Sequence, residues 1–276
     1  MHHMLYLICT PIGNLNDFSF RSINILKQVD KIYAEDTRVA AKLLQHFDIK
    51  KKTKPFHEHN ENEVSDEIIK FLQSGETIAL LSDAGAPLIS DPGFPLIQKC
   101  IDQNISFTAI PGPSAVINAL ILSGLPADNF LFNGFLPKQN EAIKKIAKKL
   151  KNSDVTNIFF ESAKRIGKTI SIFSEVLSQD AQLAICREMT KEYESIYRGN
   201  IKEICDLLKN NEIKLLGEFV ILIYPHADRH RDIDLNEDFC LQFLEYLSPA
   251  DASKLIAKIT SFSKQEVYKF LLSISK

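Results

Sequence analysis

Carboxylates, glycines and prolines gather directly after one apolar segment of this chain. Residues 77–81 are nearly all apolar, which predicts a strand buried on both faces of a parallel sheet. Prolines and glycines then end the strand. Ligands of open α/β sheets bind at the carboxyl ends of strands, so Asp83, Gly85 and Ala86 are expected to border a ligand. A plain turn, with Asp91 capping the next helix, explains the same stretch equally well.

A second charged group, formed by Glu35, Asp36 and Arg38, follows the short apolar run 32–34. That run is also predicted to be a strand. Two carboxylates and a guanidinium at the end of a strand can orient a hydroxyl group, or they can hold one another. In the second case Asp36 caps the following helix and pairs with Arg38 at the surface.

Groups that suit anions occur further along the chain. Ser114 stands at the start of a predicted helix, where exposed amides favour a carboxylate or a similar anion. The most cationic segment is a predicted helix whose lysines suit phosphate contacts. A solvent-exposed helix face that binds nothing can have the same composition. Its lysines are Lys138, Lys144, Lys145, Lys148 and Lys149. Further polar side chains follow predicted strands, namely Glu161, Ser162, Lys164, Arg165 and Arg187.

The elements that must position these groups form an alternating pattern of strands and helices. This pattern predicts an α/β fold with mainly parallel or mixed sheets and helices on their faces. We expect an N-terminal α/β domain at 1–124, a C-terminal α/β domain at 125–236 that begins with a hinge, and a small helical module at 237–276. The lysine run 50–54 is expected to be a solvated loop.

Composition narrows the classes of protein. The chain has 276 residues and a net charge of −2, which excludes a generally basic nucleic-acid coat but allows a local basic patch. Five cysteines without a CxxC pair indicate reduced core residues of a cytoplasmic protein. The first apolar segment, 5–9, is too short for a membrane span. His57 and His59 lack a third ligand at metal spacing, so we assign no metal.

Several motifs, taken in order along the chain, resemble one family. They are TPIGNL at 10–15, AEDTR at 34–38, SDAGAP at 82–87, SDPG at 90–93, PGPSA at 111–115, GFLP at 134–137 and GEF at 217–219. Together they resemble the bacterial small-subunit ribosomal RNA cytidine 2′-O-methyltransferases, which belong to the tetrapyrrole methylase superfamily. The match covers nearly the whole chain, including the final helices.

The resemblance implies two α/β domains with S-adenosylmethionine in the cleft between them, and a homodimer. Carried over position by position, the cofactor contacts are Pro11, Asp83, Ala86, Ser114 and Ala115, with Ser162 and Arg187 from the second domain. Gly85 is a further expected contact, because it lies in the loop that follows the strand 77–81. This chain departs from the family pattern in two places. Ala86 replaces the usual Thr, and Ala163-Lys164 replaces a Pro-His pair, which bears on the role of Lys164 toward RNA.

The implied reaction transfers a methyl group to the ribose 2′-hydroxyl of a cytidine in small-subunit ribosomal RNA, either naked or in the assembled subunit. The hydroxyl must lose its proton during attack. Asp36 or Glu35 would accept the proton, with Arg38 holding the carboxylate or a phosphate, and Glu161 is the rival base. The lysines of the cationic helix, together with Lys164 and Arg165, would contact the RNA.

Two other functions stay open at this stage. One is a methyltransferase for a tetrapyrrole or another small molecule, although such an enzyme needs neither the lysine-rich helix nor the helical module. The other is a protein that binds RNA or the ribosome without catalysis. The acidic and basic groups expected around the cleft argue against that function.

Overall fold

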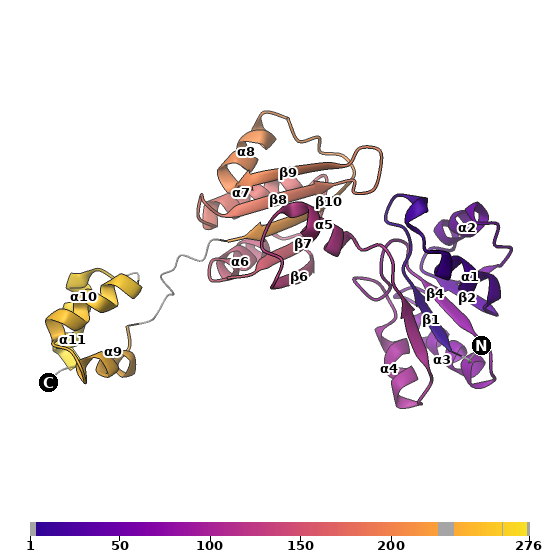
Figure 1. Ribbon diagram of the computed structural model, residues 1–276, viewed down its shortest axis with the longest axis horizontal. Coiled ribbons are helices and arrows are strands. Elements are labelled where there is room, and N and C mark those ends of the chain that lie inside the picture. Colours follow the sequence, from indigo (N-terminus) through magenta and orange to yellow (C-terminus); the bar gives the residue numbers. More distant parts are fainter. Residues whose placement is uncertain (1–3, 226–234, 261, 275–276) are drawn as a thin grey trace.

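The computed structural model describes residues 4–225, 235–260 and 262–274. These residues form two α/β domains, each built on one sheet, and a separate group of helices at the C-terminal end (Figure 1). The predicted fold class is confirmed. Within the described ranges, no helix has both the length and the apolar character that crossing a membrane requires.

The first sheet is entirely parallel, with the strand order β3-β2-β4-β1-β5. Its strands are β1 (Leu5–Ile8), β2 (Lys31–Ala34), β3 (Thr53–Pro55), β4 (Ile78–Leu81) and β5 (Phe107–Ile110). All residues of β1 and β4 are buried, as expected for central strands covered on both faces. Because the strands run in the same direction, their carboxyl ends lie along one edge of the sheet.

Helices cover both faces of this sheet. The helices are α1 (Phe20–Gln28), α2 (Thr37–His46), α3 (Glu61–Gln73) and α4 (Phe94–Asp102), with a short 3-10 turn, η1 (Leu15–Asp17), before α1. Alternate residues of β1 point to opposite faces. Ile8 packs in the core that contains α1 and α2, whereas Leu7 packs in the core that contains α3 and α4.

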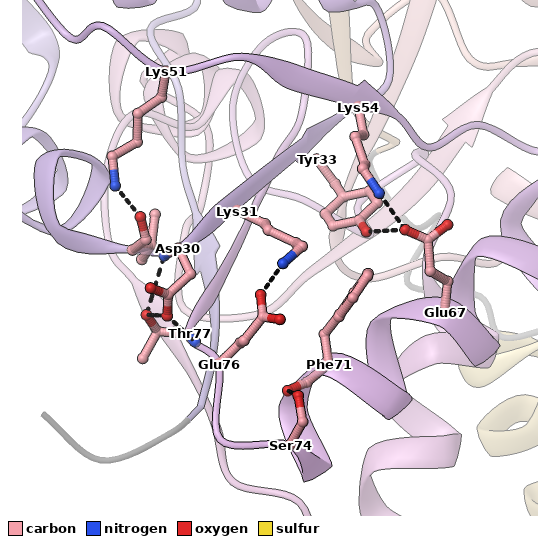
Figure 2. A network of polar contacts seen from close by, with 11 residues as sticks. Asp30, Lys31, Tyr33, Lys51, Lys54, Glu67, Phe71, Ser74, Glu76 and Thr77 are labelled. Carbon is pink, nitrogen blue, oxygen red and sulfur yellow. Dashed lines mark hydrogen bonds and ion pairs between the residues drawn. The ribbon is translucent and has the colours of Figure 1, made fainter.

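The lysine run 50–54 is not a solvated loop. Part of it forms the edge strand β3, and Figure 2 shows how two of its lysines are held. Lys51 donates to the backbone carbonyl of Val29, and Lys54 pairs with Glu67, which also accepts a hydrogen bond of 2.9 Å from Tyr33. The prediction was wrong because these partners lie far away in the sequence.

The second sheet is mixed, with the order β6-β7-β10-β8-β9. Only β6 and β7 are parallel, and the other neighbours are antiparallel. The strands are β6 (Phe130–Phe135), β7 (Thr156–Ser162), β8 (Gln182–Arg187), β9 (Ser195–Asn200) and β10 (Glu218–Tyr224). The sequence did not predict β9, whose residues are polar and only partly buried. The helices α6 (Asn140–Leu150), α7 (Ile166–Val176) and α8 (Ile201–Lys209) share one core with this sheet.

The remaining helix, α5 (Ala115–Ser123), packs on the opposite face of the second sheet. Its buried residues Val116, Ala119 and Leu120 share a core with strand residues such as Ile158 and Leu222. The predicted boundary at 124 assigned this helix to the first domain. We therefore propose that the first domain ends after β5, near Ile110, and that the second begins with α5.

The C-terminal helices are α9 (Glu237–Leu244), α10 (Pro249–Ile259) and α11 (Lys264–Ile274). They surround a small core of their own, which includes Cys240, Ile256 and Leu271. In Figure 1 they stand apart from both sheets. The predicted linker before them falls mostly in 226–234, outside the described residues.

Candidate active site

A cavity of about 550 Å³ lies between the two sheet domains. The segments that follow β1, β2 and β4 line its first-domain side. The ends of β6 and β7, the segment after β8 and the start of β10 line the other side, together with the first residues of α5. The volume is in the usual range for small-molecule sites, and the position at the carboxyl ends of parallel strands is the expected one.

Most of the predicted cofactor contacts face this cavity. Those that line it are Asp83, Gly85, Ala86, Ser114, Ala115 and Ser162. Ser114 caps α5, where its hydroxyl accepts a hydrogen bond of 3.5 Å from the amide of Ile117. The start of this helix therefore borders the cavity, and its first amides favour an anionic group there.

Pro11 and Arg187 do not line the cavity, although Ile12, next to Pro11, does. Arg187 is buried, with 4% of its surface exposed. Its guanidinium donates to the backbone carbonyls of Leu216, at 2.7 Å, and Tyr193, at 2.9 Å. Arg187 thus fixes two loops on the second-domain side.

The loop after β4 is fixed at both ends. Near its start, Gly85 exchanges backbone hydrogen bonds of 2.8 and 3.0 Å with Thr10, which follows β1. Near its end, the amide of Gly93 donates to Glu61 of α3 at 2.9 Å. Between these points Leu88 has a φ of 73°, a left-handed conformation that a bulky residue keeps only where its surroundings impose it.

Asp91, in this loop, does not cap a helix. The helix α4 begins at Phe94, and no side chain accepts a hydrogen bond from its first amides. The Oδ2 atom of Asp91 is instead buried without a hydrogen-bond partner. Burial, and then repulsion from Glu35 and Asp83, raises the pKa of Asp91 to about 7. The predicted cap is wrong because Gly93 holds the N-cap position, and Asp91 lies two residues before it.

Glu35 lies beside Asp91. Both border the large cavity and also a second, much smaller one beneath it. Burial is the main cause that raises the pKa of Glu35, and the charge of Asp83 adds to it. Asp83 accepts a hydrogen bond of 2.9 Å from the amide of Asp36. In the described part of the chain, no lysine or arginine forms an ion pair with any of these three carboxylates, Glu35, Asp83 and Asp91.

Asp36 and Arg38 are outside the lining of the cavity. The carboxylate of Asp36 caps α2, because it accepts a hydrogen bond of 2.8 Å from the amide of Arg38. The two side chains also form an ion pair of 2.5 Å, and the Arg38 side chain is 86% exposed. The hydrogen bonds from Arg38 hold the pKa of Asp36 well below its usual range. This geometry agrees with the interpretation of the pair as a helix cap, and it makes Asp36 a poor proton acceptor.

Glu161, the rival base, lines the cavity, but its side chain is fully buried and its oxygens are occupied. Oε1 accepts hydrogen bonds of 2.7 Å from the amide of Ser162 and from Nε of Arg165. Oε2 accepts one of 2.8 Å from Thr169. Arg165 also donates to the carbonyls of Leu136 and Pro137, at 2.9 and 3.1 Å. Glu161 and Arg165 thus form a structural network that joins the ends of β6 and β7.

The lysines predicted to contact RNA lie outside the cavity. Those with exposed side chains are Lys138, Lys145, Lys148, Lys149 and Lys164. Within α6, Ile143, Ala147 and Leu150 are buried against the sheet, which leaves the lysines on the remaining faces of the helix. Lys144 differs from the others, since it is partly buried and pairs with Glu175 at 3.2 Å.

Phe135 was not predicted as a site residue, although it belongs to the GFLP motif. It lines the cavity with 66% of its surface exposed. The pairing of β6 with β7 shifts register between Phe132 and Phe135, and Gly134 within this bulge has a φ of 69°. Bulges redirect side chains next to binding sites. The bulge is a tertiary feature that a single glycine in the sequence does not reveal.

Comparisons with known proteins agree with this geometry. Residues 4–205 match the model of the family described as tetrapyrrole (corrin/porphyrin) methylases. The chain belongs to this family. It is 38% identical over 273 residues to the ribosomal RNA small subunit methyltransferase I of Haemophilus influenzae, covering 98% of this chain and 96% of that protein. The protein of the same name from Halalkalibacterium halodurans is 43% identical over 225 residues, which is 82% of this chain and 77% of that protein. The resemblance inferred from the motifs is confirmed.

Several solved structures share the fold. A diphthine synthase superimposes with a TM-score of 0.62 at 12% identity, covering 80% of this chain and 89% of that one. A cobalt precorrin-4 methyltransferase gives a TM-score of 0.58 at 17% identity, covering 80% of this chain and 95% of that one. At such low identity these likenesses concern the fold alone. The share of this chain that they cover is close to the extent of its two sheet domains.

Proposed function

We propose that this chain is an S-adenosylmethionine-dependent methyltransferase that modifies the ribose 2′-hydroxyl of a cytidine in small-subunit ribosomal RNA. The observation that carries the proposal is that motifs by which the sequence resembles this family, including SDAGAP and PGPSA, lie around one cavity between two domains. Relatives that align over almost the full chain carry the name of a small-subunit ribosomal RNA methyltransferase.

The residues around the cavity fit S-adenosylmethionine. Small residues, such as Gly85, Ala86 and Ala115, leave room for a flat ring and its ribose. The carboxylate of Asp83, on the first-domain side, suits a sulfonium or an amino group, and the start of α5 suits a carboxylate. When bound, this molecule supplies an activated methyl group, so the protein mainly positions the acceptor and takes up its proton.

Within the site, we assign the role of proton acceptor to Glu35. It borders the cavity, and the pKa of its carboxyl is raised, which suits a base that works near neutral pH. Asp36 is held by Arg38 outside the lining, and the oxygens of Glu161 are occupied by Arg165 and its neighbours. The geometry therefore favours Glu35 among the candidate bases.

For the RNA substrate we propose contacts at the exposed lysines of α6 and at Lys164, which follows β7 beside the cavity. Lysines that neutralise phosphates release counterions, so the affinity for RNA should fall steeply with salt. Arg165 is instead engaged with Glu161 and two carbonyls, so we expect it to support this region rather than to bind RNA.

The deciding experiment is transfer of a labelled methyl group from S-adenosylmethionine. Isolated small ribosomal subunits, naked ribosomal RNA and a tetrapyrrole precursor serve as parallel acceptors, and nuclease mapping identifies the product. A 2′-O-methylated cytidine supports the proposal. Label in the tetrapyrrole alone overturns it in favour of a small-molecule methyltransferase. Cofactor binding by calorimetry without transfer to any acceptor overturns it in favour of an RNA-binding protein.

We also propose that the protein forms a homodimer in the cytoplasm. Ile117 and Ile121 of α5 are 45% and 72% exposed, and Leu131 of the edge strand β6 is 52% exposed. Such apolar side chains favour burial against a second copy. The five cysteines are free, as in a reducing compartment. Light scattering should give twice the mass of the chain, and Ile121→Glu should halve it. A monomeric unmodified protein contradicts the dimer.

A further inference from the structure

Two buried polar atoms in the described part of the chain have no hydrogen-bond partner, and both belong to residues near Glu35. They are Oδ2 of Asp91 and Nδ1 of His57. Asp91 and Glu35 line the same small cavity, of about 10 Å³, and His57 directly follows Phe56, which also lines it. Buried polar atoms are nearly always paired, so unpaired ones in a native site call for an explanation such as catalysis.

The chain places Asp91 there at the expense of a helix cap. An aspartate at the N-cap position ordinarily accepts hydrogen bonds from the first amides and stabilises the helix, but here Gly93 holds that position. In this loop Leu88 and Ser90 both adopt left-handed conformations, and α4 starts without a side-chain cap. Glycine is favoured at position 93, because its φ of 127° is a conformation that residues with a Cβ rarely adopt. The backbone therefore favours a position for Asp91 beside Glu35.

We propose that Asp91 and Glu35 act as an electrostatically coupled carboxyl pair, and that this pair, rather than Glu35 alone, takes up the proton that leaves the acceptor hydroxyl. Two carboxylates that line one small cavity cannot both ionise easily, and their protons come off in two coupled steps. The nature of the acceptor rests on the proposed function. The coupling rests only on the arrangement of the pair.

The surroundings of the pair are mostly acidic. Asp83, Glu58 and Asp36 add negative charge near Glu35, and Glu61 of α3 lies behind the loop at Gly93. His57 has the opposite effect and lowers the pKa of Glu35. These charges, together with burial, raise the proton affinity of both members of the pair.

The proton balance of the step is simple. The hydroxyl oxygen gains the methyl group as the carbon–sulfur bond breaks, and the electron pair of that bond stays on sulfur. The displaced proton moves to the ionised pair, and solvent receives it after the products leave. No electron is transferred, and no further reactant is needed. The pair must be ionised before each turnover. The rate should therefore fall as the pH is lowered through about 7, the pKa of Asp91.

The kinetic test is the pH profile of methyl transfer for Asp91→Asn. Removing the neighbouring charge should move the acid limb of kcat/KM down by about one pH unit, with a lower plateau because Glu35 becomes a weaker base. Asp102→Asn, at the exposed end of α4, is the matched control and should leave the limb in place. A merely structural role for Asp91 would lower the rate at every pH without moving the limb, and that result overturns the proposal.

A second test needs no activity and uses the unmodified protein. Carbon-13 NMR of labelled aspartate and glutamate carboxyls should show Asp91 titrating near pH 7. Glu35→Gln should bring that titration down by about one unit or more, because the partner charge is gone. Titration of Asp91 at its ordinary value in the unmodified protein, or no response to Glu35→Gln, overturns the coupled pair. If no acceptor is methylated, the proposed function fails, and this titration still decides whether the pair exists.

Discussion

The two sides of the cavity use carboxylates in opposite ways. On the second-domain side, Glu161 is buried, and both of its carboxylate oxygens accept hydrogen bonds, including those from Arg165 and Thr169. On the first-domain side, Asp91 is half-buried and its buried Oδ2 atom is unpaired, and no lysine or arginine forms an ion pair with Glu35 among the described residues. Satisfied carboxylates give rigidity, whereas unsatisfied ones keep a proton affinity that chemistry can use. We therefore propose that the second-domain side supplies rigidity and the first-domain side the acid–base chemistry.

The strongest test of this comparison is Glu35→Gln. Loss of the proton acceptor should lower kcat for methyl transfer by about 10²–10⁴-fold, the usual contribution of a general base. The affinity for S-adenosylmethionine, measured by calorimetry, should change little. Glu63→Gln, on the exposed side of α3, is the control. Normal turnover by the Glu35 variant would show that the first-domain side does not supply the base.

The opposite result is expected for Glu161→Ala. The substitution leaves Arg165 without its carboxylate partner in a mostly buried site, which should lower the free energy of unfolding by about 3 kcal/mol. Urea denaturation measures this change, and Glu161→Gln, which keeps part of the hydrogen bonding, should lose less. At a temperature where the variant is folded, its pH profile should keep the same acid limb. A displaced limb would assign acid–base chemistry to this side as well.

Asp91→Asn should stabilise the protein at neutral and higher pH. The pKa of Asp91 in the folded protein, about 7, is higher than its ordinary value of 3.8. Between these values the folded state binds more protons than the unfolded state, so the stability that Asp91 contributes falls as the pH rises. Asparagine does not ionise. The stability difference between the variant and the unmodified protein should therefore shift in favour of the variant by about 4 kcal/mol between about pH 4 and about pH 8. Equal differences at both pH values would contradict a buried, unpaired Asp91.

The smallest effect is expected outside the cavity, on α6. Lys148 is exposed, whereas Lys144 pairs with Glu175. Lys148→Ala should reduce the slope of log affinity against log salt by about 0.7–0.9, because one phosphate contact is lost. Lys144→Ala is the matched control on the same helix and should reduce it less. Filter binding with ribosomal RNA measures both. Equal slopes for all three proteins would move the RNA surface away from α6.

The sequence predicted most of the elements, because their patterns are local. The runs at β1 and β4 are apolar throughout, as strands covered on both faces must be, and the motifs after them mark the edge where the cavity lies. Two edge strands, β3 and β9, were not predicted, although the other two edges, β5 and β6, were. β3 and β9 carry polar residues and lack the apolar pattern that marks a strand.

The assignment of α5 shows a second limit. Its sequence, AVINALILS, is apolar around most of the helix, so its pattern does not indicate which surface it covers. The prediction followed its order in the chain and placed it with the first sheet. The structure packs it on the second, where Val116 and Leu120 meet Ile158 and Leu222.

By itself, the sequence determined the family, the α/β class, the order of the elements and the loops that carry the reactive groups. These properties depend on residue types and short spacings, which the chain displays directly. Only the tertiary structure decided which carboxylates have partners. Asp36 finds Arg38 two residues away, whereas Glu35 and Asp91 meet across a long stretch of chain, between the ends of neighbouring strands. Burial and charge at that meeting point set their proton affinity, and no local pattern encodes either.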